Sequence, residues 1–157
     1  MPEISAGLMM YKGSGADLQV LLAHPGGPFW AKKDLGAWTI PKGVVQEGED
    51  LLVAARREFT EETGIAPAEP FLPLGEVRMK SGKRVHAWAF TGACDPLDVI
   101  SNTFQLEWPP RSGKMQSFAE IDRCAFYTVP EACEKILPYQ LDFITRLATH
   151  LGAPHPG

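Results

Sequence analysis

The chain has 157 residues, of which 45% are hydrophobic and 10% aromatic, and its formal net charge at pH 7 is −4. That length and apolar content are sufficient for one domain with a substantial core. The negative charge disfavours a protein that binds along an extended nucleic-acid backbone. No run of about 18 apolar residues and no basic segment followed by an apolar stretch occurs, so we expect neither a membrane span nor a signal peptide.

The cysteine pattern indicates a reducing compartment. The three cysteines, Cys94, Cys124 and Cys133, are odd in number and show no C-x-x-C spacing. This spacing favours buried or unreactive thiols over a disulfide or a zinc site. We therefore expect a cytoplasmic protein.

Alternating apolar and polar residues, interrupted by Gly and Pro, predict a series of short strands. The predicted strands span residues 4–11, 18–23, 37–40, 71–79, 84–92 and 125–128. We expect Pro41 to stop the third strand, with Lys42 and Gly43 opening a loop.

Three segments have helical character. The longest runs from an N-cap at Asp50 to a terminating Gly64, and a shorter helix begins at Pro130. Residues 139–151 carry apolar side chains on one stripe, as an amphipathic terminal helix does. The whole order predicts an α/β fold in which helices pack on a mixed sheet.

Three carboxylates mark one face of the longest predicted helix. Glu58, Glu61 and Glu62 are related as i, i+3 and i+4, which places them side by side. Like charges at that spacing repel one another unless a cation gathers them, and ligands that are all carboxylates suit Mg²⁺, Mn²⁺ or Ca²⁺. The alternative is a solvated face on which Arg57 pairs with Glu61.

The segment GVVQEGEDLLVAARREFTEETGI, residues 43–65, decides between these two interpretations. It fits the pattern G-x5-E-x7-R-E-U-x-E-E-x-G-U, in which U is apolar, and so resembles a Nudix box. The resemblance implies a Nudix-type α/β/α sandwich over residues 2–137, with residues 138–151 forming a helix on the same domain. It also implies Mg²⁺-dependent hydrolysis of a nucleoside diphosphate linked to another group X, with Mn²⁺ as an alternative metal.

The resemblance also assigns roles within and after the box. The implied metal ligands are Glu58, Glu61, Glu62, Gly43 and Glu49. Arg57 is expected to orient a glutamate with its planar guanidinium fork.

A general base must take the proton of the attacking water. Glu58 inside the box and Glu120 in a later loop are both candidates, with Glu107 in reserve. Glu120 is equally well explained as an ordinary loop carboxylate.

The substrate is the least constrained part of the prediction. The approach Ala37-Trp38-Thr39-Ile40-Pro41-Lys42-Gly43 and the late Glu120 look similar to diadenosine polyphosphate hydrolases, which favours a dinucleoside polyphosphate. Such enzymes often place a base-stacking aromatic where this chain has Cys124. The alternatives are a house-cleaning (d)NTP pyrophosphatase and a non-catalytic nucleotide-binding module.

Four residues are expected to bind the substrate, a small nucleotide. The aromatic one would line a base pocket, and the cationic ones would contact phosphates. The alternatives are that the tryptophan covers the core from a Pro/Gly turn and that the cationic residues are ordinary surface charges. These residues are Trp30, Lys33, Lys42 and Arg111. The sequence does not indicate an oligomeric state.

Overall fold

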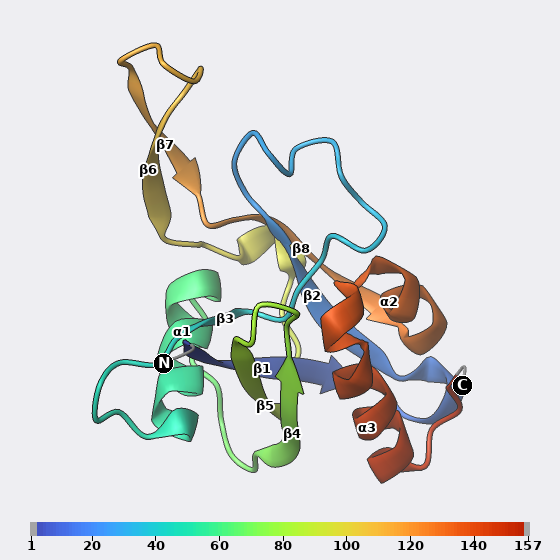
Figure 1. The fold of residues 1–157 in the computed structure, drawn as a ribbon. Coiled ribbons are helices and arrows are strands. Elements are labelled where there is room, and N and C mark those ends of the chain that lie inside the picture. Colours follow the sequence, from blue (N-terminus) through green and yellow to red (C-terminus); the bar gives the residue numbers. More distant parts are fainter. Residues whose placement is uncertain (1–2, 156–157) are drawn as a thin grey trace.

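A six-stranded mixed sheet forms the centre of the molecule (Figure 1), as seen in a computed structural model that describes residues 3–155. The strand order is β4-β5-β1-β2-β8, and β3 pairs with β1. Strands β1 and β5 run parallel, whereas the other neighbours are antiparallel. The strands are β1 (Ile4–Lys12), β2 (Gln19–Pro25), β3 (Lys42–Val44), β4 (Leu72–Arg78), β5 (Arg84–Thr91) and β8 (Ile121–Thr128).

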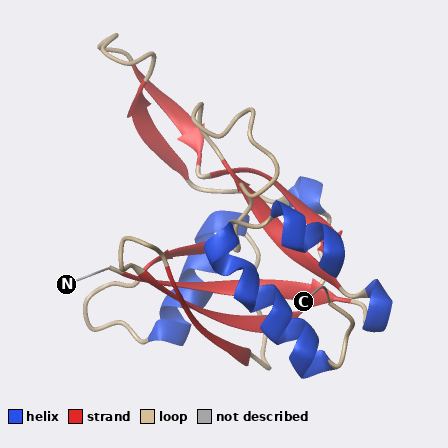
Figure 2. Ribbon diagram, turned by 45° about the vertical axis from the view of Figure 1, so that its right-hand side comes forward, coloured by secondary structure: helices blue, strands red, loops and turns tan. Residues whose placement is uncertain are grey.

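Helices cover both faces of this sheet (Figure 2). Helix α1 (Leu51–Thr63) packs on one face, and α2 (Val129–Lys135) and α3 (Leu141–Leu151) pack on the other. Because successive strand side chains point to opposite faces, β1 supplies Leu8 to the α1 layer and Met9 to the α2–α3 layer. The predicted α/β/α sandwich is confirmed.

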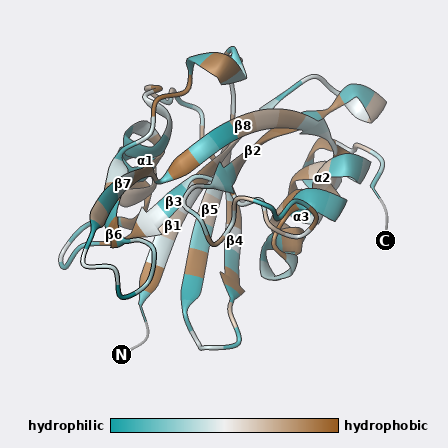
Figure 3. Ribbon diagram, turned by 90° about the horizontal axis from the view of Figure 1, so that it is seen from above, coloured by the Kyte–Doolittle hydropathy of each residue, from teal (hydrophilic) through white to brown (hydrophobic). Residues whose placement is uncertain are grey.

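The hydropathy pattern follows this layering. In Figure 3 hydrophobic and hydrophilic residues alternate along β4 and β5. Phe59 of α1 and Phe143 of α3 are both fully buried, one on each side of the sheet. Within the described part of the chain, no helix is both long and apolar enough to cross a membrane.

A second, two-stranded sheet was not predicted. Strands β6 (Thr103–Glu107) and β7 (Met115–Ala119) form a hairpin that projects from the domain (Figure 1). Its base is packed tightly, because Phe104 lies so close to Gly27 that an added Cβ would stand 3.0 Å from its ring. The hairpin therefore leans on the loop that follows β2.

The prediction for residues 37–44 was wrong in its details. Residues 37–40 form only isolated bridges, Thr39 with Ala23 and Trp38 with Ile136, rather than a strand. The regular pairing lies one step later, where β3 pairs with β1 in place of the expected loop. Trp38 is buried in the core, so the apolar residues that suggested a strand here are explained by burial and not by strand pairing.

The other boundaries shift by small amounts. Strand β8 begins at Ile121, four residues before its prediction, and α3 begins at Leu141 after a short 3-10 turn. Pro2, where the predicted domain begins, lies outside the described residues. The 3-10 turns are η1 (Gly15–Asp17), η2 (Pro96–Asp98) and η3 (Pro138–Gln140).

Candidate metal centre and substrate cleft

The ends of helix α1 are held by local hydrogen bonds. The Asp50 carboxylate accepts from the backbone N–H groups of Leu52 at 3.1 Å and Val53 at 3.2 Å. Gly64 ends the helix with φ of 77°, in the left-handed region that favours glycine. The predicted cap and terminator are confirmed, and they determine which residues the helix presents.

Arg57 is the centre of an ion-pair network. Its Nε and Nη2 donate to the two carboxylate oxygens of Glu49 at 2.8 and 2.9 Å, which is a bidentate fork. Its Nη1 donates to Glu58 Oε1 at 2.8 Å and to Glu61 Oε2 at 3.1 Å. The Arg57 guanidinium, with the backbone N–H of Gln46, holds the pKa of Glu49 at about 2. Arg57 thus ties the loop before α1 to two of its glutamates.

Gly43 leaves room for Glu58. A Cβ built on Gly43 would overlap the Glu58 carboxylate, so only a glycine allows the helix to approach β3 this closely. The Glu58 side chain is only 13% exposed, and burial raises its pKa. A left-handed backbone conformation is not the reason for this glycine, since its φ is not positive. Space alone explains it.

A cleft of about 350 Å³ lies beside this network, and we call it the glutamate cleft. It is lined by Glu62 from α1, Lys42 from β3 and Glu120, which is the residue before β8. Its aromatic walls are Trp30, from the loop after β2, and Tyr139, from the turn before α3. Five different segments of the chain therefore meet at one opening.

The charges in the glutamate cleft affect one another. Burial raises the pKa of Glu62 to about 8, and the neighbouring carboxylates of Glu120 and Glu58 add to the effect. Lys42 opposes it, although burial lowers the pKa of Lys42 itself. The Glu62 carboxyl is therefore held in a place where added positive charge would stabilise its ionised form.

These residues fit a hard divalent cation. Every candidate ligand supplies oxygen, the donor that Mg²⁺ and Mn²⁺ prefer in proteins. In residues 3–155, however, no three His, Cys, Asp or Glu side chains are grouped closely enough to hold a metal as they stand. The Arg57 guanidinium already engages Glu58 and Glu61, so a bound cation would share or replace that contact.

Two predicted substrate residues lie away from the glutamate cleft. Lys33 lines a separate pocket beside it. Arg111 lies in the turn between β6 and β7, where its backbone N–H donates to the Glu107 carboxylate at 3.0 Å. That turn is the tip of the projecting hairpin (Figure 1). The structure therefore brings Lys42, Trp30 and Glu120 to the box, but not Arg111 or Glu107.

Sequence reasoning missed Tyr139 as a cleft residue. It sits in η3, and its hydroxyl is 2.9 Å from Gln140 Nε2, whose side chain also bonds Thr39. The buried Gln140 was a usable signal, because a polar side chain inside a core needs partners and here it fixes η3 against residues 39–40.

The comparisons agree with this geometry. The NUDIX domain family model matches residues 1–147, and the chain belongs to the Nudix family. An RNA pyrophosphohydrolase from Caulobacter vibrioides is 49% identical over 55 residues, about a third (32%) of this chain and of that protein's length.

Two solved structures show the same fold over nearly the whole chain. The C. elegans Ap4A hydrolase, solved as a binary complex, has a TM-score of 0.65 at 23% identity and covers 94% of this chain and 98% of its own. The NUDIX domain of Shewanella oneidensis NrtR, solved with ADP ribose, also has a TM-score of 0.65, at 17% identity over 96% of this chain and 89% of its own.

Proposed function

We propose that this protein is a Mg²⁺-dependent hydrolase of a nucleoside diphosphate linked to a group X, and that its best substrate is a dinucleoside polyphosphate. The observation that supports this most is the glutamate cleft, which Glu62, Glu120 and Lys42 line together with the aromatic residues Trp30 and Tyr139. Family membership supports a diphosphate as the substrate's reacting part.

The residues of segment 43–65 have two kinds of role in this proposal, metal binding and the positioning of the metal ligands. Glu58, Glu61 and Glu62, with Gly43 and Glu49, are the residues that would hold Mg²⁺. When bound, the ion would neutralise the diphosphate's charge and activate a water. Arg57 holds Glu49, Glu58 and Glu61 in place before any ligand arrives.

Glu120 is the better general base of the two candidates. Glu58 is almost buried and accepts a hydrogen bond from Arg57, so its carboxylate is already engaged. Glu120 is exposed and lines the cleft, where a water's proton can reach it. Lys42 lies in the same cleft and would contact a phosphate oxygen.

The aromatic walls support a nucleoside in the cleft. Cys124 is buried and does not replace the base-stacking aromatic. Trp30 and Tyr139 provide two rings at the opening instead, and stacking on such rings tolerates any base. Free cysteines at 94, 124 and 133 suit a reducing cytoplasm, which is where we place the enzyme.

The test is a substrate panel with Mg²⁺ and identification of the products. It would contain diadenosine tetraphosphate, nucleoside triphosphates, an oxidised deoxynucleotide, ADP-ribose and RNA with a 5′-triphosphate. We expect kcat/KM to be highest for diadenosine tetraphosphate. A triphosphate preferred by tenfold or more, about 1.4 kcal/mol in transition-state stabilisation, would replace this assignment with a house-cleaning pyrophosphatase.

A further inference from the structure

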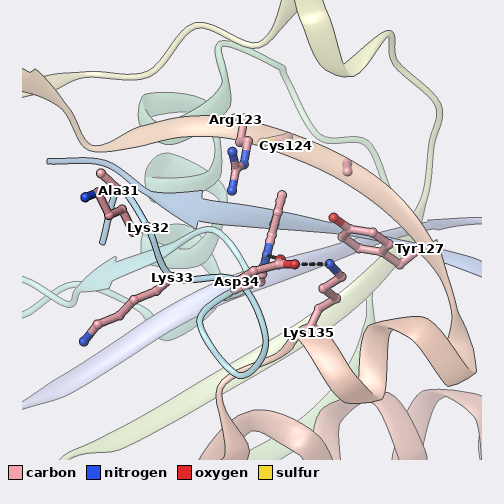
Figure 4. Close-up of a pocket in the computed structure, with 10 residues that line it drawn as sticks. Ala31, Lys32, Lys33, Asp34, Arg123, Cys124, Tyr127 and Lys135 are labelled. Atoms are coloured by element: carbon pink, nitrogen blue, oxygen red, sulfur yellow. Dashed lines mark hydrogen bonds and ion pairs between the residues drawn. The ribbon is translucent and has the colours of Figure 1, made fainter. Parts of the chain in front are cut away.

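A second pocket, of about 420 Å³, lies next to the glutamate cleft, and we call it the basic pocket (Figure 4). Four cationic side chains and one carboxylate are among its lining residues, although the whole protein carries a net charge of −4. The charged lining residues are Lys32, Lys33, Arg123, Lys135 and Asp34. A concentration of positive charge on an acidic protein points to an anionic ligand.

Two of these cations are held in position by aromatic rings. The Arg123 guanidinium lies 5.3 Å from the Trp38 ring centroid, and the Lys135 ammonium lies 5.4 Å from that of Tyr127. The two rings meet edge to face at 5.2 Å. Contacts of this kind orient a cation while leaving its outer side free to bind. The floor of the pocket is therefore built before a ligand arrives.

Asp34 controls how much positive charge the pocket offers. Its carboxylate accepts from the Lys135 ammonium at 2.6 Å and from Trp38 Nε1 at 2.9 Å. These bonds lower the pKa of Asp34, so it stays ionised and competes with any anion for Lys135. In Figure 4 the Lys32 and Lys33 side chains point away from Asp34, Arg123 and Lys135.

The basic pocket and the glutamate cleft share a wall. Trp30 lines the cleft, and the Lys33 ammonium of the basic pocket lies 5.1 Å from the Trp30 ring centroid. The fully buried His24 anchors this wall, since its Nε2 is 2.6 Å from the Lys33 carbonyl oxygen and its Nδ1 is 2.9 Å from Asp122. The wall therefore has a fixed shape.

The chain direction gives the separation between the two sites. Glu120 lines the cleft and Arg123 lines the basic pocket, three residues apart at the start of β8. Three extended residues span roughly 10 Å. A separation of this size suits a phosphate chain longer than a diphosphate, because a diphosphate held at the glutamates would leave the basic pocket empty.

We propose that the basic pocket is a subsite for the distal phosphates of a substrate with a long phosphate chain. This inference rests on the proposed function, in which the glutamate cleft holds the diphosphate that is cut. It would explain a preference for substrates with a long phosphate chain, because only such substrates would contact both the glutamate cleft and the basic pocket.

Binding of inorganic tripolyphosphate, measured by calorimetry in excess EDTA, tests the pocket without any hydrolysis. With no metal present the carboxylates of the glutamate cleft repel the probe, so binding reports the basic pocket. We expect Arg123→Gln to weaken binding by about fivefold. We expect Asp34→Asn to strengthen it, because the amide keeps an acceptor for Trp38 but releases Lys135.

Lys12→Gln is the matched control. Lys12 also rests on an aromatic ring, 4.0 Å from the Phe126 centroid, but it does not line the basic pocket. We expect Lys12→Gln to bind tripolyphosphate like the wild type. Failure of the wild type to bind, or equal losses in Arg123→Gln and Lys12→Gln, would overturn the anion site.

Kinetics with Mg²⁺ then separate a distal subsite from an independent anion site. Arg123→Gln should reduce kcat/KM for diadenosine tetraphosphate and pentaphosphate by about fivefold and leave that for ADP-ribose unchanged. Equal losses on all substrates, or none on the long ones, would contradict a distal subsite. A protein that binds tripolyphosphate but hydrolyses nothing in the panel would refute the proposed function while leaving the anion site standing.

Discussion

The box network and the opposite wall of the glutamate cleft are assembled in different ways. The network of Glu49, Arg57, Glu58 and Glu61 comes from one helix and the loop before it, so its partners are neighbours in sequence. The opposite wall joins segments that lie more than a hundred residues apart, such as Trp30 and Tyr139. Under the proposed function, the first region would supply reactivity that any diphosphate can use. The second would determine which diphosphate fits.

Glu62→Gln tests the first region, with the largest effect that we expect. The variant removes a ligand of the proposed metal site, and because loss of even the residues that orient metal ligands typically costs roughly 10–100-fold, we expect kcat to fall by about 100-fold or more, equally for every substrate in the panel. Steady-state kinetics with Mg²⁺ measure it. A loss confined to one substrate would instead place Glu62 with the specificity wall.

The same variant checks that the fold survives. Because the folded pKa of Glu62 is raised to about 8, stability without metal is greatest below the unfolded value near 4.5 and falls as the pH rises toward 8. The glutamine of Glu62→Gln cannot ionise, so the free energy of unfolding of this variant should fall less across that range than that of the wild type. Urea unfolding at pH 5 and pH 8 in EDTA compares the two proteins.

Arg57 should act through orientation rather than charge. Arg57→Ala and Arg57→Lys are both expected to lose about 10- to 100-fold in kcat/KM, because an ammonium cannot form the fork to Glu49 while also reaching Glu58. Kinetics of the two variants on diadenosine tetraphosphate decide the point. Wild-type rates in the Lys variant would show that charge alone is sufficient.

Gly43→Ala should disturb the network through overlap with Glu58. Overpacking of this kind costs about 1–3 kcal/mol in stability. The cost should disappear when Glu58 is also shortened to Ala, which a double-mutant cycle of urea midpoints measures. An undiminished cost in the double variant would mean that the added methyl group meets something other than Glu58.

Trp30→Ala probes the opposite wall and should have the smallest effect on catalysis. Loss of one stacking ring costs about 1–3 kcal/mol of binding per base, so KM for diadenosine tetraphosphate should rise roughly tenfold while kcat changes little. The ratio of kcat/KM between substrates is the readout. A fall in kcat as large as that of Glu62→Gln would remove the distinction between the two regions.

The parts of the structure that were predictable are those encoded locally. Asp50 and Gly64 are recognisable because capping depends on adjacent backbone groups, and the Arg57 fork follows from spacing within one helix turn and its loop. Tertiary contacts decide the rest. For example, Lys33 lines the same pocket as Arg123 and Lys135 and not that of Lys42, and no pattern in the sequence around Lys33 predicts this.

The β6–β7 hairpin shows a second limit. Strand β6 does alternate, with Phe104 and Leu106 half-buried between exposed neighbours, whereas β7 does not, and none of the residues in either strand is fully buried. A strand without a buried face shows only a weak alternation of apolar and polar residues, so no strand was predicted in this segment. The projecting hairpin could be recognised only from the pairing itself.

A titration of Mg²⁺ into the metal-free protein at pH 6 and pH 8 tests the central claim, that the acidic face of α1 is a metal site. Because burial raises the pKa of Glu62 to about 8, an ion that binds at pH 6 must displace a proton. We therefore expect proton release and an affinity that rises with pH, by at most roughly tenfold per unit, until it levels off near pH 8. Glu62→Gln should reduce the proton release, and Glu58, whose pKa burial also raises, would account for what remains. Undetectable Mg²⁺ binding at pH 8, or an affinity independent of pH, would contradict the central claim.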